Sequence, residues 1–203
     1  MVYIPCCYAQ LQNDKMLIEN KGIKTDNFYI PPFDLNVGEI VVLYLFNGQH
    51  FYETEMFLKD IFCGKSKDKN VIVHKNLTFV EHFIEPKLRR LFYPVTVGEY
   101  IKKNTSLDSP YATKIYEIEW INEKTKVNTL AGTPRRLLSL YATLSKTKNI
   151  VFDLAGQDPQ GAEETYKVVK EVVNKGGSAI LLDCFEDMKN DCTKYVELQW
   201  NKK

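Results

Sequence analysis

The sequence predicts an α/β fold in which a mostly parallel sheet is flanked by helices. Three short runs rich in β-branched and aliphatic residues carry this prediction: GEIVVLYLF at 38–46, NIVFD at 149–153 and SAILL at 178–182. Their lack of polar alternation is typical of strands that are buried on both faces of a parallel sheet. Helical patterns separate the runs, and strand–helix–strand order favours right-handed crossovers between parallel strands.

Size and charge limit the kinds of partner. The chain has 203 residues, 44% of them hydrophobic, and its 27 basic and 26 acidic side chains give a net charge of +1. This suits one α/β domain, 1–203, and excludes long-range attraction to nucleic acid or anionic lipid, although it leaves room for a local basic patch. We therefore expect no nucleic-acid partner.

No segment predicts direct membrane insertion or secretion. The longest apolar run, Ile40–Phe46, is far shorter than the roughly 20 residues of a membrane-spanning helix. The N-terminal MVYIPCCYAQ has no basic region followed by an apolar stretch, so it does not read as a signal peptide. We expect a cytoplasmic protein that reaches the membrane only through a partner.

The cysteines and histidines do not predict a metal site. Five cysteines at irregular spacing include no CxxC pair, which favours free thiols, and three scattered histidines read as structural or surface residues. They are Cys6, Cys7, Cys63, Cys184 and Cys192, with His50, His74 and His82.

The first part of the chain reads as strands that form an N-terminal antiparallel β portion. Tyr3–Tyr8 is short and apolar, and Phe28–Phe33 contains two prolines that indicate an edge or a turn. After the strand at 38–46, Asn47 and Gly48 predict a turn, and the apolar spacing in Glu53–Cys63 predicts a helix.

The middle of the chain is less regular. Val71–Val73 reads as a strand, and Leu77–Leu91 as helical or irregular. Val97–Lys103 predicts a short helix that Thr96 caps. Residues 104–128 are polar and poorly patterned, and within them Ile115–Ile121 suits either a helix or a strand.

The last third is clearer. Thr133 and Pro134 predict the start of a helix, with threonine as the N-cap and proline as the first helical residue. Ala162–Asn174 predicts a second helix that ends at two glycines. A helix at Glu186–Cys192 and a final strand at Tyr195–Leu198 complete the pattern.

Five segments in this order resemble the ATP-binding domain of ABC transporters, a P-loop NTPase-like family. They are FDLNVGEIVVLY at 33–44, LFYPVTVGEYI at 91–101, LAGTPRRLLSL at 130–140, NIVFDLAGQDPQGAEETYKVVKE at 149–171 and SAILLDCFEDMKNDC at 178–192. The resemblance covers about residues 33–200 and implies a single domain. It also implies that residues 104–128 are a reduced version of the family's helical subdomain.

The resemblance places a phosphate loop after the strand at 38–46. Such a loop uses a glycine-rich turn, a lysine and a Ser or Thr. Asn47 and Gly48 keep part of the family pattern. Without gaps, Phe51 and Tyr52 take the lysine and Ser/Thr positions, whereas counting back from Gly64 puts Glu55 at the lysine position. The GKS at 64–66 follows a predicted helix instead of a buried strand, which argues against a phosphate loop there.

Other family positions are changed as well. Asp153 matches the aspartate that helps to hold Mg²⁺, but Leu154 replaces the glutamate that activates water. Asp183 stands at the position of the switch histidine. In the signature segment Leu130 and Gly132 are kept, while the serine and the second glycine are absent.

Gln157, Asp158 and Pro159 keep a D-loop, which in the family meets a partner subunit. Two further features can be interpreted either as ordinary structure or as part of a site. Arg135 and Arg136 read as a solvated helix start or as an anion site, and we hypothesise that Phe46, Phe51 and Tyr52 fill the place of the phosphates.

These positions together predict a non-catalytic ABC-ATPase-like subunit that acts as a binding or scaffold component of a transporter-like complex. No catalytic residue is predicted; nucleotide, if bound, would contact the family positions Asn47, Gly48, Leu130, Gly132, Asp153 and Asp158, with Asp153 on Mg²⁺. The expected partner is a second copy, an active ABC ATPase or a membrane subunit. Two alternatives remain open: an atypical ATPase, and an unrelated α/β protein that uses Cys184 or Asp183.

Overall fold

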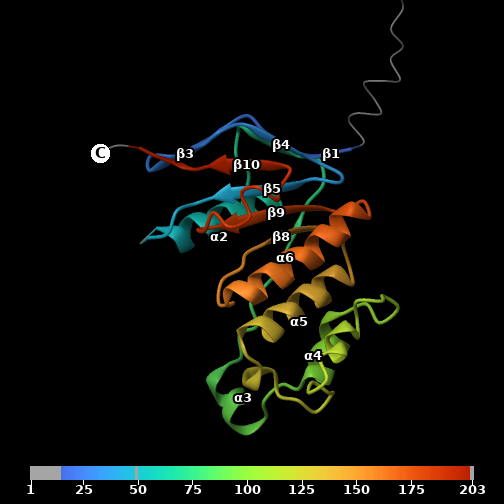
Figure 1. Ribbon diagram of the computed structural model, residues 1–203. Coiled ribbons are helices and arrows are strands. Elements are labelled where there is room, and N and C mark those ends of the chain that lie inside the picture. The colour runs from blue at the N-terminus through green and yellow to red at the C-terminus, as the bar shows by residue number, and fades with distance from the viewer. Residues whose placement is uncertain (1–14, 49, 202–203) are drawn as a thin grey trace, which may run out of the picture.

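A computed structural model describes residues 15–48 and 50–201 and has a five-stranded parallel sheet at its centre (Figure 1). Every neighbouring pair in the sheet is parallel. The strand order is β10 (Lys194–Glu197), β5 (Ile40–Tyr44), β9 (Ser178–Asp183), β8 (Asn149–Phe152) and β7 (Thr78–Phe79). The predicted fold class and its four strands at 38–46, 149–153, 178–182 and 195–198 are confirmed.

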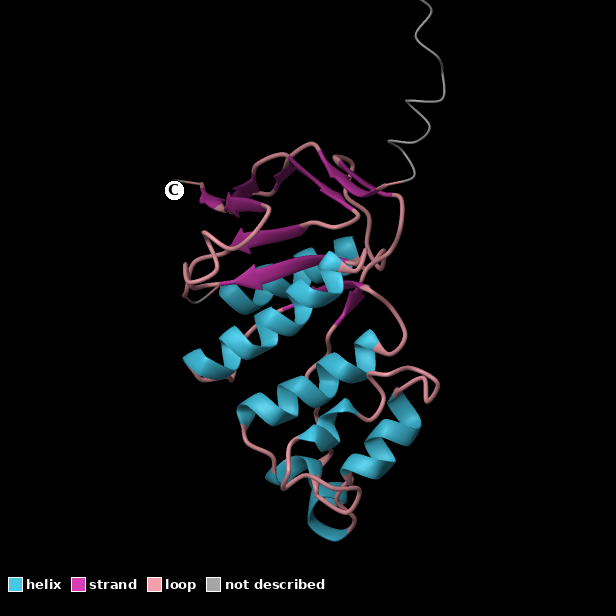
Figure 2. Ribbon diagram, turned by 45° about the vertical axis from the view of Figure 1, so that its right-hand side comes forward, coloured by secondary structure: helices cyan, strands magenta, loops and turns pink. Residues whose placement is uncertain are grey.

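Two small antiparallel sheets form a layer beside the central sheet, as Figure 2 shows. They confirm the expected N-terminal β portion. Pro31 and Pro32, which indicated an edge or a turn, separate the strands Phe28–Ile30 and Phe33–Asn36, because proline lacks the N–H that a ladder needs. Tyr3–Tyr8 lies outside the described residues. The two sheets have the orders β4 (Phe33–Asn36), β1 (Met16–Asn20), β6 (Val71–Val73) and β11 (Gln199–Trp200), β3 (Phe28–Ile30), β2 (Ile23–Lys24).

Helices cover both faces of the central sheet. Alternate side chains of each strand point to opposite faces. Val42, Phe152 and Leu181 pack in one core with α5 (Gly132–Leu144) and α6 (Pro159–Asn174). Their neighbours along the strands pack in a second core with α2 (Phe51–Phe62) and the antiparallel strands. The uninterrupted apolar strands of the sequence thus reflect burial on both faces.

Residues 87–129 form a helical part at the end of the molecule opposite the antiparallel strands (Figure 1). Thr96 caps α4 in a reciprocal capping box with Glu99, which confirms the predicted cap. The predicted helix or strand at Ile115–Ile121 is absent. Ile115 lies in a single 3₁₀ turn instead. The helical part contains α3 (Lys87–Phe92), α4 (Val97–Asn104), η1 (Lys114–Glu117) and η2 (Val127–Thr129).

Two predicted element boundaries are wrong. Helix α5 begins at Gly132 with Ala131 as the N-cap, so Pro134 is the third helical residue. Proline is tolerated there because the first four N–H groups of a helix have no intrahelical partner. Helix α6 begins earlier than expected, at Pro159, because the Asp158 carboxylate accepts from the Gly161 N–H and caps it.

The predicted helix at Glu186–Cys192 is absent from the structure, which has turns there. The N–H of Lys189 donates to the Glu186 oxygen and the N–H of Asp191 to the Met188 oxygen, three residues back in each case. Asp and Asn side chains in this segment favour turns over helix. No helix within the described ranges is long and apolar enough to cross a bilayer.

Candidate functional site

The Asp153 carboxylate is the centre of a buried polar cluster at the carboxyl end of β8. Its Oδ2 accepts a hydrogen bond from Arg136 Nη2 over 2.7 Å. His82 Nε2 lies 3.1 Å from Oδ1 and 3.0 Å from Oδ2, and the Ala155 N–H donates to Oδ1 over 2.9 Å. Burial disfavours ionisation of Asp153, but the His82 hydrogen bond and the charge of Arg136 outweigh it and hold its pKa below the ordinary value.

Arg136 is buried in this cluster. Its guanidinium also donates to the main-chain oxygens of Val80, over 2.7 Å, and of Asp153. The interpretation of Arg136 as part of a solvated helix start is therefore wrong: only 4% of the residue is exposed. Arg135 bonds instead to the main-chain oxygens of Asn128 and Leu130. A buried arginine needs a buried acid, and Asp153, at the end of an apolar strand, supplies it.

Glu55 extends the cluster from helix α2. The residue is 5% exposed, and its Oε1 has no hydrogen-bond partner among the described residues. Burial and then the negative charge of Asp153 raise the pKa of Glu55 to about 8. One turn further, Lys59 forms an ion pair of 2.9 Å with Glu81 and lies over the ring of Phe79. At neutral pH Glu55 therefore keeps its proton while Asp153 stays charged.

The turn at Asn47 and Gly48 joins β5 to α2. Helix α2 begins at Phe51. Phe51 and Tyr52 of the ungapped register therefore lie in its first turn, and Glu55 of the register counted back from Gly64 lies in its second. Phe51 packs against the second core, as does Phe46. Tyr52 is 68% exposed and fills no cavity, so the hypothesis of aromatic filling is wrong for Tyr52.

The donors around Asp153 do not suit Mg²⁺. This ion takes carboxylate oxygens in a near-octahedral shell and keeps several waters. Here each oxygen of Asp153 already accepts two hydrogen bonds, and one of the donors is a guanidinium. Leu154 follows, and its side chain has no oxygen to offer. No group of three or more His, Cys, Asp or Glu side chains that could hold a metal occurs in residues 15–48 and 50–201.

The signature-like segment packs directly against the D-loop of the same chain. A Cβ at Gly132 would overlap the main-chain oxygen of Gly156, and the hydroxyl of Thr133 donates to Asp158 over 3.4 Å. The side chain of Leu130 is buried in the first core. The structure thus brings Gly132 and Asp158 together, while Asn47 and Gly48 lie at the turn before α2.

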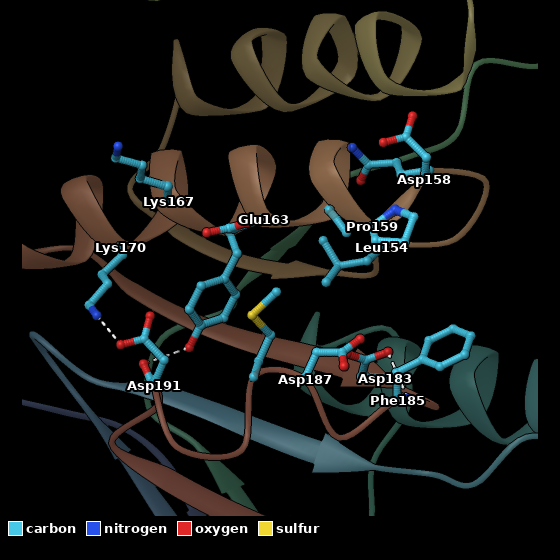
Figure 3. A pocket seen from close by; sticks show the side chains of 14 residues that line it. Leu154, Asp158, Pro159, Glu163, Lys167, Lys170, Asp183, Phe185, Asp187 and Asp191 are labelled. Atoms are coloured by element: carbon cyan, nitrogen blue, oxygen red, sulfur yellow. Dashed lines mark hydrogen bonds and ion pairs between the residues drawn. The ribbon is translucent and has the colours of Figure 1, made fainter.

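A groove of about 940 Å³ runs between α6 and the turns after β9 (Figure 3). Leu154, Tyr166 and Met188 provide apolar lining, and Asp158 and Asp183 lie at one end. Burial raises the pKa of Asp183 to about 6. The groove therefore joins the D-loop position to the position of the switch histidine.

The described cysteines are free and half-buried: Cys63, Cys184 and Cys192. Burial raises the pKa of the Cys184 thiol, which disfavours the thiolate that a nucleophile needs.

No family model matches the sequence, and no curated protein matches it. Solved structures do. An assigned ABC transporter ATP-binding protein of Pyrococcus furiosus has a TM-score of 0.66 at 18% identity, covering 90% of this chain and 96% of that one.

Two further solved structures have a similar fold. An inward-facing transporter assigned to the metal-chelate type of ABC transporters gives a TM-score of 0.65 at 15% identity, over 93% of this chain and 83% of that chain. CbiO1 of Clostridium perfringens, part of the ABC transporter complex cbiONQ, gives 0.63 at 13% identity, over 91% and 85%. With its parallel sheet, its flanking helices and its antiparallel strands, this chain has the P-loop NTPase-like fold of ABC transporter ATP-binding domains.

Proposed function

We propose that this chain is an ABC-ATPase-like subunit that binds or organises partners in a transporter-like complex and does not hydrolyse ATP. One observation carries the proposal: the Asp153 carboxylate is held by Arg136 Nη2 at 2.7 Å and by His82. In the family this aspartate serves Mg²⁺. Here the chain's own Arg136 and His82 satisfy it, and its side chain is 1% exposed.

The charges at the start of α2 support the same conclusion. A phosphate loop neutralises the β- and γ-phosphates with a lysine. The first two turns of α2 contain Glu53 and Glu55 and no cation. The lysine of this helix, Lys59, lies in its last turn and is paired with Glu81. Removing one comparable stabilising group costs about 10²–10³ in rate, so several such losses leave negligible turnover.

The proposed partner contact includes the D-loop. Asp158 and Pro159 are exposed on the described surface, at the end of the groove beside α6. In the resembling family this loop meets a second subunit, and CbiO1, which shares the fold, is part of a transporter complex. We therefore place the chain in the cytoplasm with a second copy, an active ABC ATPase or a membrane subunit. Residues 104–128, within the helical part, would serve as its reduced helical subdomain.

Calorimetric titration of the purified chain with ATP and Mg²⁺ tests the proposal. We expect no binding at millimolar nucleotide and no release of phosphate above that of buffer. Asp153→Asn should leave this result unchanged, although it disturbs the polar cluster. Micromolar binding that needs Mg²⁺ and is lost in Asp153→Asn would contradict the proposal and establish the atypical ATPase instead.

A second measurement tests the partner contact. Sedimentation of the chain alone, over a range of concentrations, shows whether it forms a dimer without nucleotide. If it dimerises, Asp158→Asn should weaken the dimer, and Glu186→Gln, an exposed acid outside the groove lining, should not. If the chain neither forms a dimer nor associates with an active ABC ATPase mixed with it, the proposed scaffold role is wrong.

A further inference from the structure

Helix α3 turns an apolar face to the solvent. Leu88, Leu91 and Phe92 occupy positions i, i+3 and i+4, which share one side of a helix. Ile84 precedes this side and Tyr93 follows it. All five are between 65% and 85% exposed, and no residue of α3 is buried. These five side chains are called the α3 patch below.

An amphipathic helix normally packs such a side against the protein core. In α3 the apolar side chains are exposed instead. Figure 1 places the helix at the tip of the helical part, far from the three sheets. Contiguous exposed apolar side chains mark surfaces that something covers.

The charged side chains around the α3 patch are mainly basic, which indicates what kind of surface would cover it. Lys87, Arg89 and Arg90 all lie in the same six residues. Arg89 makes a long, exposed contact of 3.9 Å with Glu99, and Lys87 and Arg90 have no ion-pair partner among the described residues. Glu85, the nearest other acid, is turned inward, where it accepts from the Val95 N–H over 2.6 Å. The patch is therefore locally cationic although the whole chain is almost neutral.

A second copy of the chain does not fit this patch. A symmetric contact would place Lys87, Arg89 and Arg90 against the same three cations of the other copy. Leu, Phe and Tyr next to Lys and Arg are the composition of segments that lie in the membrane interface, with apolar side chains among the acyl chains and cations at anionic headgroups.

We propose that the α3 patch binds the surface of an anionic lipid bilayer, with Leu88, Leu91 and Phe92 entering the headgroup boundary. This goes beyond the proposed function and does not depend on whether nucleotide binds. It also revises the expectation that the chain reaches the membrane only through a partner. No helix needs to span the bilayer for this contact.

Flotation of the full chain with vesicles tests the proposal. We expect binding to phosphatidylcholine vesicles that contain about a third phosphatidylglycerol, and little binding to pure phosphatidylcholine. A Lys or Arg near an anionic leaflet changes partition roughly fivefold. The triple variant Lys87→Gln, Arg89→Gln, Arg90→Gln should therefore bind on the order of a hundredfold more weakly, and added salt should reproduce part of that loss.

The apolar side chains have their own variant and control. Leu88→Ser, Leu91→Ser, Phe92→Ser should abolish binding even to the anionic vesicles, whereas Leu107→Ser should not, since Leu107 is 64% exposed elsewhere on the helical part. The thermal midpoint should stay unchanged in all variants because these side chains pack against no core. This comparison separates lost binding from lost folding.

Three results would overturn the proposal. They are no vesicle binding by the unmodified chain, equal binding to neutral and anionic vesicles, and equal loss in Leu107→Ser and in the apolar triple variant. Self-association of the chain without vesicles, abolished by the apolar triple variant, would assign the patch to a second copy. The nucleotide titration reports separately on the proposed function, so the two can fail independently.

Discussion

Arg136 and Asp153 form a fully buried ion pair, with Nη2 of the arginine 2.7 Å from Oδ2 of the aspartate. The two residues come from different elements, α5 and the carboxyl end of β8. The same guanidinium also binds the main-chain oxygens of Asp153 and Val80. One side chain therefore fixes a helix to the ends of two neighbouring strands.

Removing one partner of this pair should be costly. We expect Arg136→Met to lower the free energy of unfolding by about 3–5 kcal/mol, because Asp153 then stays buried without its cation. Urea unfolding at neutral pH measures this. Arg89→Met is the matched control, since Arg89 is half exposed and its contact with Glu99 is long. It should change stability by less than about 1 kcal/mol.

The double variant Arg136→Met, Asp153→Leu separates charge from packing. We expect it to be more stable than Arg136→Met alone, because apolar replacement of both partners removes the uncompensated charge. If the double variant is the less stable of the two, the loss comes from the shape of the site and not from the stranded carboxylate.

Stability should fall as pH rises towards 8. The pKa of Glu55 is about 8 in the folded chain and 4.5 when unfolded, so the folded chain binds the extra proton between these values. The stabilisation is complete below pH 4.5 and is lost as pH rises through 8. The slope cannot exceed about 1.4 kcal/mol per pH unit for this group. Urea unfolding between pH 6 and 8 measures it.

Two variants test whether Glu55 causes this dependence of stability on pH. Glu55→Gln should flatten it, because the glutamine side chain carries no titrating proton. Asp183→Asn should leave it unchanged between pH 7 and 8, since Asp183 has a pKa of about 6 and has lost most of its proton by pH 7. An undiminished slope in Glu55→Gln would show that another group carries the effect.

The contact between Gly132 and Gly156 leaves no room for a side chain. We expect Gly132→Ala to cost about 1–3 kcal/mol, because its Cβ would overlap the main-chain oxygen of Gly156. Gly98→Ala is a milder comparison, with a Cβ 3.1 Å from Glu123. If both variants unfold at the same urea concentration, the two loops are not packed as described.

Asp158 combines a structural role with the proposed partner contact. Its carboxylate caps α6 by accepting from the Gly161 N–H over 2.8 Å. Asp158→Ala should therefore cost about 1 kcal/mol, whereas Asp158→Asn should keep most of the stability because asparagine caps equally well. Thermal unfolding of the two variants measures the difference. A similar loss in both would mean that the charge, and not the cap, stabilises the helix.

The parallel sheet was predictable because β5, β8 and β9 are uninterrupted apolar runs separated by helical patterns. The boundaries of α5 and α6 were less predictable. Thr133 has the residue type of an N-cap, but its hydroxyl bonds Asp158 across the fold, and only the tertiary contact reveals this. Likewise, β1 pairs with β4 and β6, which no local pattern specifies.

The candidate site was predictable only in part. Asp153 stood out as a carboxylate at the end of an apolar strand. Its partner Arg136 read as a solvated helix start or an anion site, because the sequence does not reveal which face of α5 packs on the strand ends. His82 read as a structural or surface residue, and its side chain is 44% exposed. The sequence placed Glu55 at the lysine position of the phosphate loop, and only in one of two possible registers. Its burial depends on the start of α2 at Phe51.

The pairing of β10 with β5 joins residues about 150 positions apart, as the bond from the Ile40 N–H to the Thr193 hydroxyl illustrates. During synthesis, β5 leaves the ribosome long before the strand that covers its edge. Until then an apolar strand offers unpaired main-chain groups to any other extended segment. We expect the nascent chain to need protection from aggregation until residues 194–200 emerge and complete both the central sheet and the small sheet around β3.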